Sequence, residues 1–143
     1  MQVSKLIQGR ASSDIVSCPV DATLREAVRI LANRRIGAMP VMQEGRVAGI
    51  VSERDVLYCL ASDGEGTLDK PVRNVMTSPA ITIGPGGDCE EALSLMSRRR
   101  IRHLPVVEGD TMIGFLSIGD LVKSRIDEVS QEADAMRDYI QMA

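Results

Sequence analysis

Aromatic residues are nearly missing from this sequence: its 143 residues include one Phe, two Tyr and no Trp. A core built without them must be aliphatic, drawn from Val, Ile, Leu, Ala and the eight Met. Proteins that bind single-stranded nucleic acids commonly stack the bases on aromatic side chains. The net charge of −3 also supplies no basic field for a polyanion. The composition therefore predicts no nucleic-acid partner.

Histidine and cysteine are equally scarce. His103 is the one histidine, and the three cysteines, Cys18, Cys59 and Cys89, are odd in number and widely spaced. A zinc site needs several His or Cys ligands at set spacings, and a disulfide framework needs paired cysteines. We therefore expect no metal site, no disulfide framework and a cytoplasmic location.

Long apolar runs and catalytic signatures are also lacking. No stretch approaches the ~20 apolar residues that a membrane span requires, and the N-terminus has no signal-peptide pattern. The sequence has no G-x-S-x-G elbow, no P-loop lysine and no G-x-G-x-x-G fingerprint. We expect no membrane contact, no catalytic residue and no enzymatic activity.

An internal repeat organises what is present. Residues 34–41 align with residues 99–106, and residues 49–57 align with residues 114–122, both at an offset of 65. Two copies of a motif are too few for a solenoid. Each unit has about 60 residues and no aromatic core, and a domain of that size is marginally stable by itself. We therefore expect a pseudo-symmetric domain in which two units pack together.

Each unit is predicted to have the element order β-α-β-β-α. Short, mainly apolar segments bounded by turn residues indicate strands over residues 14–18, 39–42 and 47–51 in the first unit, and over 80–83, 104–107 and 111–116 in the second. Residues 44–46 and 108–110 are predicted hairpin turns.

The helices have recognisable starting points. Thr23-x-x-Glu26 and Asp88-x-x-Glu91 have the spacing of capping boxes, in which a side chain accepts a hydrogen bond from a free helix N–H. The polar, Gly-rich residues 62–67 are predicted to be a linker between the two units.

The last segment has apolar residues at alternating steps of four and three, which is a heptad pattern: Val122, Ile126, Val129, Ala133, Met136 and Ile140. Two interpretations stay open. An amphipathic helix could pack on its own domain, or the same face could bind a second copy of the chain.

The motif Gly-h-h-Ser-x-x-Asp, where h is an apolar residue, occurs at residues 49–55 and 114–120. The serine and aspartate are explained by helix capping alone. Capping does not explain the glycine or the matched arginine-rich turn upstream. A helix N-terminus attracts phosphate, a carboxylate suits a ribose diol, and a glycine permits close approach to a flat ring.

These motifs resemble the cystathionine β-synthase (CBS) domain family in its tandem form, the Bateman module. The resemblance covers about residues 3–125 and is greatest to short stand-alone bacterial members. It rests on the apolar-Gly-x-x-Pro or Arg-His-Leu-Pro entry into the second strand and the Gly-h-h-Ser-x-x-Asp exit from the third, each present twice. It implies an α/β (α+β) fold of two pseudo-symmetric β-α-β-β-α units packed sheet to sheet. Their expected bounds are residues 1–66 and 67–125, followed by a C-terminal amphipathic helix over 126–143.

The resemblance also implies a function. Modules of this family bind AMP, ATP, NAD(H) or S-adenosyl compounds in clefts between the units and transmit occupancy to a regulated partner protein. We therefore expect an adenine-nucleotide-binding, energy-sensing regulatory protein that forms a homodimer. Two alternatives stay open. One is a dimerisation module without a ligand, and the other is an enzyme or a redox switch, for which Cys18 and Cys89 would be the reactive residues of the switch.

Family positions carried over residue by residue give two nucleotide clefts. The first is expected to contain Ser52, Arg54, Asp55, Ala80, Ile81, Arg102, His103 and Pro105. The second is expected to contain Ser117, Asp120, Ile15, Gly37, Ala38 and Pro40. Charge-assisted contacts to phosphate are the strong ones, and the second cleft has Gly37, Ala38 and Gly119 where the first has charged or imidazole side chains. We therefore predict tight nucleotide binding beside Asp55, and weak binding or a less charged adenosine beside Asp120.

The basic residues also have simpler interpretations. Arg98, Arg99 and Arg100 suit a solvated helix end, where positive charge complements the helix dipole. His103 could be a surface residue of a strand.

Overall fold

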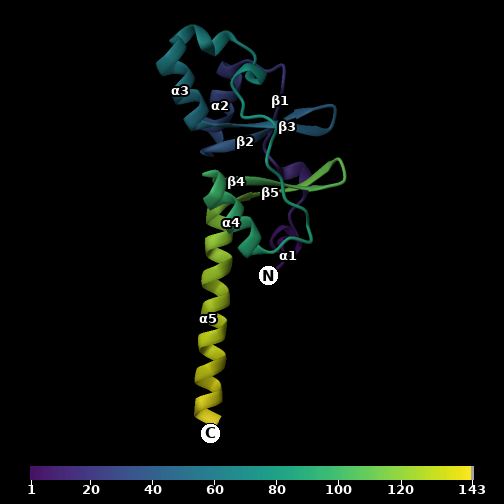
Figure 1. The fold of residues 1–143 in the computed structure, drawn as a ribbon, viewed down its shortest axis with the longest axis vertical. Helices are drawn as coiled ribbons and strands as arrows, with labels where there is room; N and C mark the ends of the chain where they lie inside the picture. Colours follow the sequence, from purple (N-terminus) through teal and green to yellow (C-terminus); the bar gives the residue numbers. More distant parts are fainter. Residues whose placement is uncertain (143) are drawn as a thin grey trace.

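Two small sheets lie against each other in the computed structural model, which describes residues 1–142 (Figure 1). The first sheet has the order β1 (Cys18–Pro19), β2 (Ala38–Gln43) and β3 (Arg46–Ser52), and the second consists of β4 (His103–Glu108) and β5 (Thr111–Ser117). β1 runs parallel to β2, and the other pairs are antiparallel. The predicted fold of two mixed α/β units packed sheet to sheet is confirmed.

Helices cover the outer faces of the sheets, and the last one projects away from the body (Figure 1). The α-helices are α1 (Val3–Ile7), α2 (Leu24–Arg34), α3 (Glu53–Asp63), α4 (Cys89–Arg99) and α5 (Ile118–Met142). Three 3₁₀ helices join them: η1 (Ser12–Asp14), η2 (Glu65–Asp69) and η3 (Val72–Asn74). The Thr23–Glu26 capping box of α2 is confirmed in both directions, whereas at α4 only the Asp88 side chain accepts, from the Glu91 N–H at 2.8 Å.

The two hairpins repeat each other in register. Val41 pairs with Gly49 in the first, Val106 pairs with Gly114 in the second, and a bulge follows each pair. In the first turn Glu44 and Gly45 both have positive φ, 51° and 78°, as the two-residue turns that match strand twist require. The offset of 65 is therefore a structural repeat as well as a sequence repeat.

Two predicted strands are wrong in extent. Of residues 14–18 only Cys18 lies in a strand, β1, which continues to Pro19, and residues 80–83 contribute only a bridge between Ile83 and Val106. Both segments diverge from the neighbouring hairpin, and their leading residues line cavities instead of a hydrogen-bonded ladder. The divergence opens the space in which the candidate site lies.

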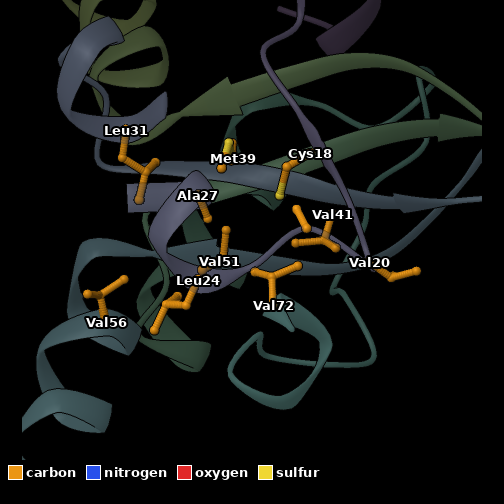
Figure 2. Close-up of a cluster of buried hydrophobic side chains, with 11 residues drawn as sticks. Cys18, Val20, Leu24, Ala27, Leu31, Met39, Val41, Val51, Val56 and Val72 are labelled. Atoms are coloured by element: carbon orange, nitrogen blue, oxygen red, sulfur yellow. The ribbon is translucent and has the colours of Figure 1, made fainter. Parts of the chain in front are cut away.

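The leading segment of each unit packs on the core of the other unit. Val3 and Ile7 of α1 are buried with the core of the second unit, and the Val3 N–H donates to the Gly87 carbonyl at 2.8 Å. Figure 2 shows Val72, which follows the predicted linker, among the buried side chains of the first unit. Its N–H donates to the Ala22 carbonyl at 2.7 Å.

The predicted linker is more ordered than its composition indicates. α3 continues to Asp63, η2 begins after Gly64, and Thr67 is buried. Because the segments are exchanged, packing crosses the expected boundary at residue 66, and that boundary stays a prediction.

α5 is one continuous helix of 25 residues, about 37 Å long. Of the predicted heptad face, all six residues are exposed, and Ile126 is 60% and Met136 67% accessible. The face therefore does not pack on its own domain. Ala143, the last residue of the predicted segment, lies outside the described residues. Along residues 1–142, no helix is both long enough and apolar enough to cross a membrane.

Candidate functional site

The two motif aspartates occupy equivalent positions at the first turns of α3 and α5. Asp55 Oδ2 accepts a hydrogen bond from the Ser52 backbone N–H at 2.9 Å, and Asp120 Oδ2 accepts one from the Ser117 N–H at 2.9 Å. Each serine Oγ accepts the reciprocal bond at 3.2 Å. The capping interpretation is therefore correct for both motifs. The backbone N–H of each serine bonds to Oδ2 and not to Oδ1, and each aspartate lines a cavity.

The cavity beside Asp55, which we call the Asp55 cleft, has a volume of about 270 Å³, just below the usual ~300 Å³ lower end for ligand pockets. Its lining comes from both units: Gly37, Ala38, Ile50, Ser52, Glu53, Arg54, Asp55, Thr77, Pro79, Ala80, Ile81, Arg100, Ile101, Arg102 and His103. Three of these residues are arginines and two are carboxylates, so the cleft has a formal net charge of +1. Asp55 Oδ1 accepts one hydrogen bond, from the Thr77 hydroxyl at 3.2 Å.

The second cavity, the Asp120 cleft, has a volume of about 500 Å³. Its lining is Ile7, Gly9, Arg10, Ala11, Asp14, Ile15, Val16, Ile36, Gly37, Ala38, His103, Ile113, Gly114, Phe115, Ser117 and Asp120. Here the Arg10 guanidinium donates to Asp120 Oδ1 at 3.3 Å and to Oδ2 at 3.5 Å. Burial raises the pKa of Asp120, but hydrogen bonds from Ser117 and Arg10 outweigh it and hold that pKa below its usual value.

Most residues carried over from the family line the expected cleft. Pro40 and Pro105 do not: both are buried within their hairpins, where the Pro105 carbonyl accepts a bond from the Ile83 N–H. Gly37 and Ala38, expected beside Asp120, line both clefts.

His103 also lines both clefts, so it is not a plain surface residue of a strand. Its ring stacks on Phe115 at a centroid distance of 5.5 Å and an interplanar angle of 13°. Burial lowers the pKa of His103 below its usual value, and the Asp120 carboxylate opposes that change only in part. At neutral pH His103 therefore supplies a flat neutral ring rather than a charge for phosphate.

The motif glycines permit a close approach, but to the protein itself. A Cβ at position 49 would lie 2.7 Å from the Thr77 carbonyl oxygen, and one at position 114 would lie 2.7 Å from Ile7 Cγ2. Thr77 and Ile7 belong to the two exchanged segments. The glycines are thus explained by packing of those segments, and the proposed contact with a ring is not needed to explain them.

Two residues that contact the motif aspartates are not predicted from the sequence. Thr77 and Arg10 each approach an aspartate Oδ1 from an exchanged segment. The repeat gave no signal for them, because an offset of 65 matches Thr77 with Ser12 and Arg10 with Val75.

The cysteines do not support a redox switch. Burial raises the pKa of the Cys18 thiol to about 11, which keeps it protonated and unreactive at neutral pH. Cys89 is buried as well. Among residues 1–142, no group of three or more His, Cys, Asp or Glu side chains is arranged to hold a metal ion.

Comparison with known proteins agrees with this architecture. The CBS domain family model matches residues 3–62 and 72–127. A mitochondrial CBS domain-containing protein of Arabidopsis thaliana, CBSX3, is 35% identical over 129 residues, which are 87% of this chain and 63% of that protein, so the chain spans less than two thirds of it.

Solved structures give the same result. A CBS-domain containing protein from Agrobacterium tumefaciens superposes with a TM-score of 0.81 and 31% identity, over 87% of this chain and 99% of that chain. The structure of CBSX2 in complex with AMP has a TM-score of 0.76 at 22% identity, over 88% of this chain and 96% of that one, and shows a shared fold. The chain therefore belongs to the CBS domain family, as a tandem pair of CBS units.

Proposed function

We propose that this protein is a regulatory module that binds an adenine nucleotide in the Asp55 cleft. The observation that carries the proposal is that Asp55 lines a cavity between the two units together with three arginines. Binding of AMP by a protein of the same fold supports the ligand class.

The Asp55 cleft has a partner for each part of such a ligand. The Asp55 carboxylate can accept hydrogen bonds from both hydroxyls of a ribose, with Thr77 giving up its place. The arginines of the cleft can bind phosphate through charge-assisted hydrogen bonds: Arg54, Arg100 and Arg102. Apolar side chains on both walls suit a flat adenine: Ile50, Ile81 and Ile101.

Ligand occupancy can be transmitted because the cleft is shared. Ser52 to Asp55 belong to the first unit, and Arg100 to His103 belong to the second. A ligand that contacts both units changes their relative orientation to the extent that it binds one arrangement better than another. The equivalent aspartate of the second unit, Asp120, lies in the first turn of α5, so we propose that α5 transmits the change to a partner protein.

A thermal-shift panel on nucleotide-stripped protein tests this function. AMP, ADP, ATP, NAD, NADH and S-adenosylmethionine are each added at increasing concentration. A ligand that binds only the native state stabilises it by ~2.7 kcal/mol at 100 times its dissociation constant, which is several degrees for a chain of this length. A selective shift with one or more nucleotides is expected. A flat panel would contradict the proposal and favour the ligand-independent dimerisation module.

The exposed face of α5 supports a second role, self-association, and we propose a parallel homodimer through this helix. The pattern of four and three residues that runs from Val122 to Ile140 forms a continuous apolar face on the helix. In a parallel pair Glu132 would lie opposite Arg137 of the second copy, which is attractive. An antiparallel pair would bring Lys123 opposite Arg137, which is repulsive.

Sedimentation velocity tests the dimer. Ile126→Asp places a charge within the apolar face, and burying an unpaired charge costs several kcal/mol. We expect the dimer dissociation constant to rise by at least about 100-fold. The matched control is Gln131→Asp, which adds the same charge on the opposite face of the helix and should leave the dimer intact. A dimer that survives Ile126→Asp unchanged would place the interface elsewhere.

A further inference from the structure

Arg10 reaches the Asp120 cleft from the segment that is exchanged between the units. The residue follows Gly9, whose φ of 81° turns the chain after α1, and its guanidinium pairs with a carboxylate 110 residues away. Arg10 therefore lies in the second unit's cleft although it belongs to the leading segment of the first unit.

The same carboxylate has a different partner in each repeat. Asp55 Oδ1 accepts from the neutral hydroxyl of Thr77, and Asp120 Oδ1 accepts from the charged guanidinium of Arg10. In both repeats Oδ2 is committed to the helix cap. A ribose diol that places both hydroxyls on Asp120 Oδ1 uses both lone pairs of the oxygen that Arg10 now contacts. Arg10 then needs another partner.

Arg10 is free to make that change. Its side chain is 50% exposed and that of Asp120 is 28% exposed, and solvent-exposed ion pairs add little to stability. Among the described residues that line the Asp120 cleft, Arg10 is the only Lys or Arg, and His103 is neutral. The other charges of the lining are the carboxylates of Asp14 and Asp120. A phosphate group in this cleft thus has one cation available to it, and that cation is Arg10.

We propose that Arg10 is the phosphate-binding residue of the Asp120 cleft, and that it moves from Asp120 to the phosphate when the ribose hydroxyls bind the carboxylate. The inference rests on the proposed nucleotide binding and deepens it. It assigns to the Asp120 cleft a preference for phosphorylated adenosines over adenosine. The sequence predicts weak binding or a less charged adenosine there, because the positions equivalent to Arg102 and His103 are Gly37 and Ala38.

Isothermal titration calorimetry with AMP and with adenosine tests the exchange. The measurements are made in an Asp55→Ala background, so that the Asp120 cleft is the site observed. Arg10→Gln is expected to weaken AMP binding by about tenfold, the worth of one charge-assisted hydrogen bond. Adenosine binding should be unchanged or tighter, because its competitor for Asp120 has been removed. Arg10→Lys, which keeps the charge, should retain part of the preference for AMP.

Arg46→Gln is the matched control. Arg46 forms an exposed pair with Asp110 at 3.1 Å and lines neither cleft, so its loss should change neither affinity. The inference is overturned if Arg10→Gln changes AMP and adenosine binding by the same factor or changes neither, or if the Asp55→Ala protein binds no AMP. Failure of the underlying function is recognised separately, because the unsubstituted protein would then bind neither compound.

Discussion

Replacing Asp55 with alanine is expected to weaken AMP binding to the Asp55 cleft by about 100-fold or more. The two ribose hydroxyls would lose the carboxylate that accepts their hydrogen bonds. Bonds to a charged acceptor are worth about 1.5 kcal/mol each at the lower end of their range, which together corresponds to a factor of more than 100 in the dissociation constant. Calorimetry on nucleotide-stripped protein measures the change.

The same substitution also removes half of a helix cap, and the two effects must be separated. Asp55 Oδ2 accepts the Ser52 N–H at 2.9 Å, and the loss of such a cap costs about 1 kcal/mol of unfolding free energy. Glu26→Ala is the matched control, because Glu26 holds the same position in the capping box of α2 and lines neither cleft. It should lower stability by a similar amount and leave AMP binding unchanged. Equal loss of affinity in both variants would mean that Asp55 acts only as a cap.

Gly49→Ala is expected to destabilise the protein by about 2–3 kcal/mol. The new Cβ would lie 2.7 Å from the Thr77 carbonyl oxygen and 2.8 Å from Met76 Sδ, and overpacking of this kind costs 1–3 kcal/mol. The carbonyl cannot withdraw easily, because Thr77 and Ile50 exchange both backbone hydrogen bonds, at 3.0 and 2.9 Å. Thermal denaturation should show a fall in Tm of about 10 °C.

Two other glycines calibrate this result. Gly114→Ala should cost less, about 1 kcal/mol, because its Cβ meets the Ile7 side chain, part of which can rotate away. A Cβ added at position 66 would have no neighbour within 4 Å, and the backbone there does not have a positive φ. Gly66→Ala should therefore leave the free energy of unfolding the same or raise it slightly. If Gly49→Ala were as well tolerated as Gly66→Ala, the segment at residues 76–77 would not be packed as described. The Asp55 cleft depends on that packing, because it positions Thr77.

The chemistry of the two clefts differs more than the repeat implies. The Asp55 cleft has Arg54 on α3, Arg100 at the end of α4 and Arg102 just before β4. The Asp120 cleft has its arginine on the exchanged segment. A ligand beside Asp55 therefore meets cations already in place, whereas a ligand beside Asp120 must first separate an ion pair. We expect tighter binding beside Asp55, as the sequence predicts, but for this additional reason.

The sequence by itself determined the features that depend on neighbouring residues. The Thr23 cap, the turn at Glu44 and Gly45, and the caps at Ser52 and Ser117 are local, since each is set by residues within a few positions. The repeat then placed both units and both aspartates, because two copies with one offset must fold alike.

Tertiary structure alone decided which segments complete each cleft. The short strands at residues 14–18 and 80–83 could not be bounded, because their pairing depends on a hairpin more than 20 residues away. The contacts of Thr77 with Asp55 and of Arg10 with Asp120 join residues 22 and 110 positions apart. Contacts at such separations leave no periodic pattern in the chain. They follow from burial of apolar side chains, because the leading segment of each unit buries Val3 and Ile7, or Val72, in the core of the opposite unit.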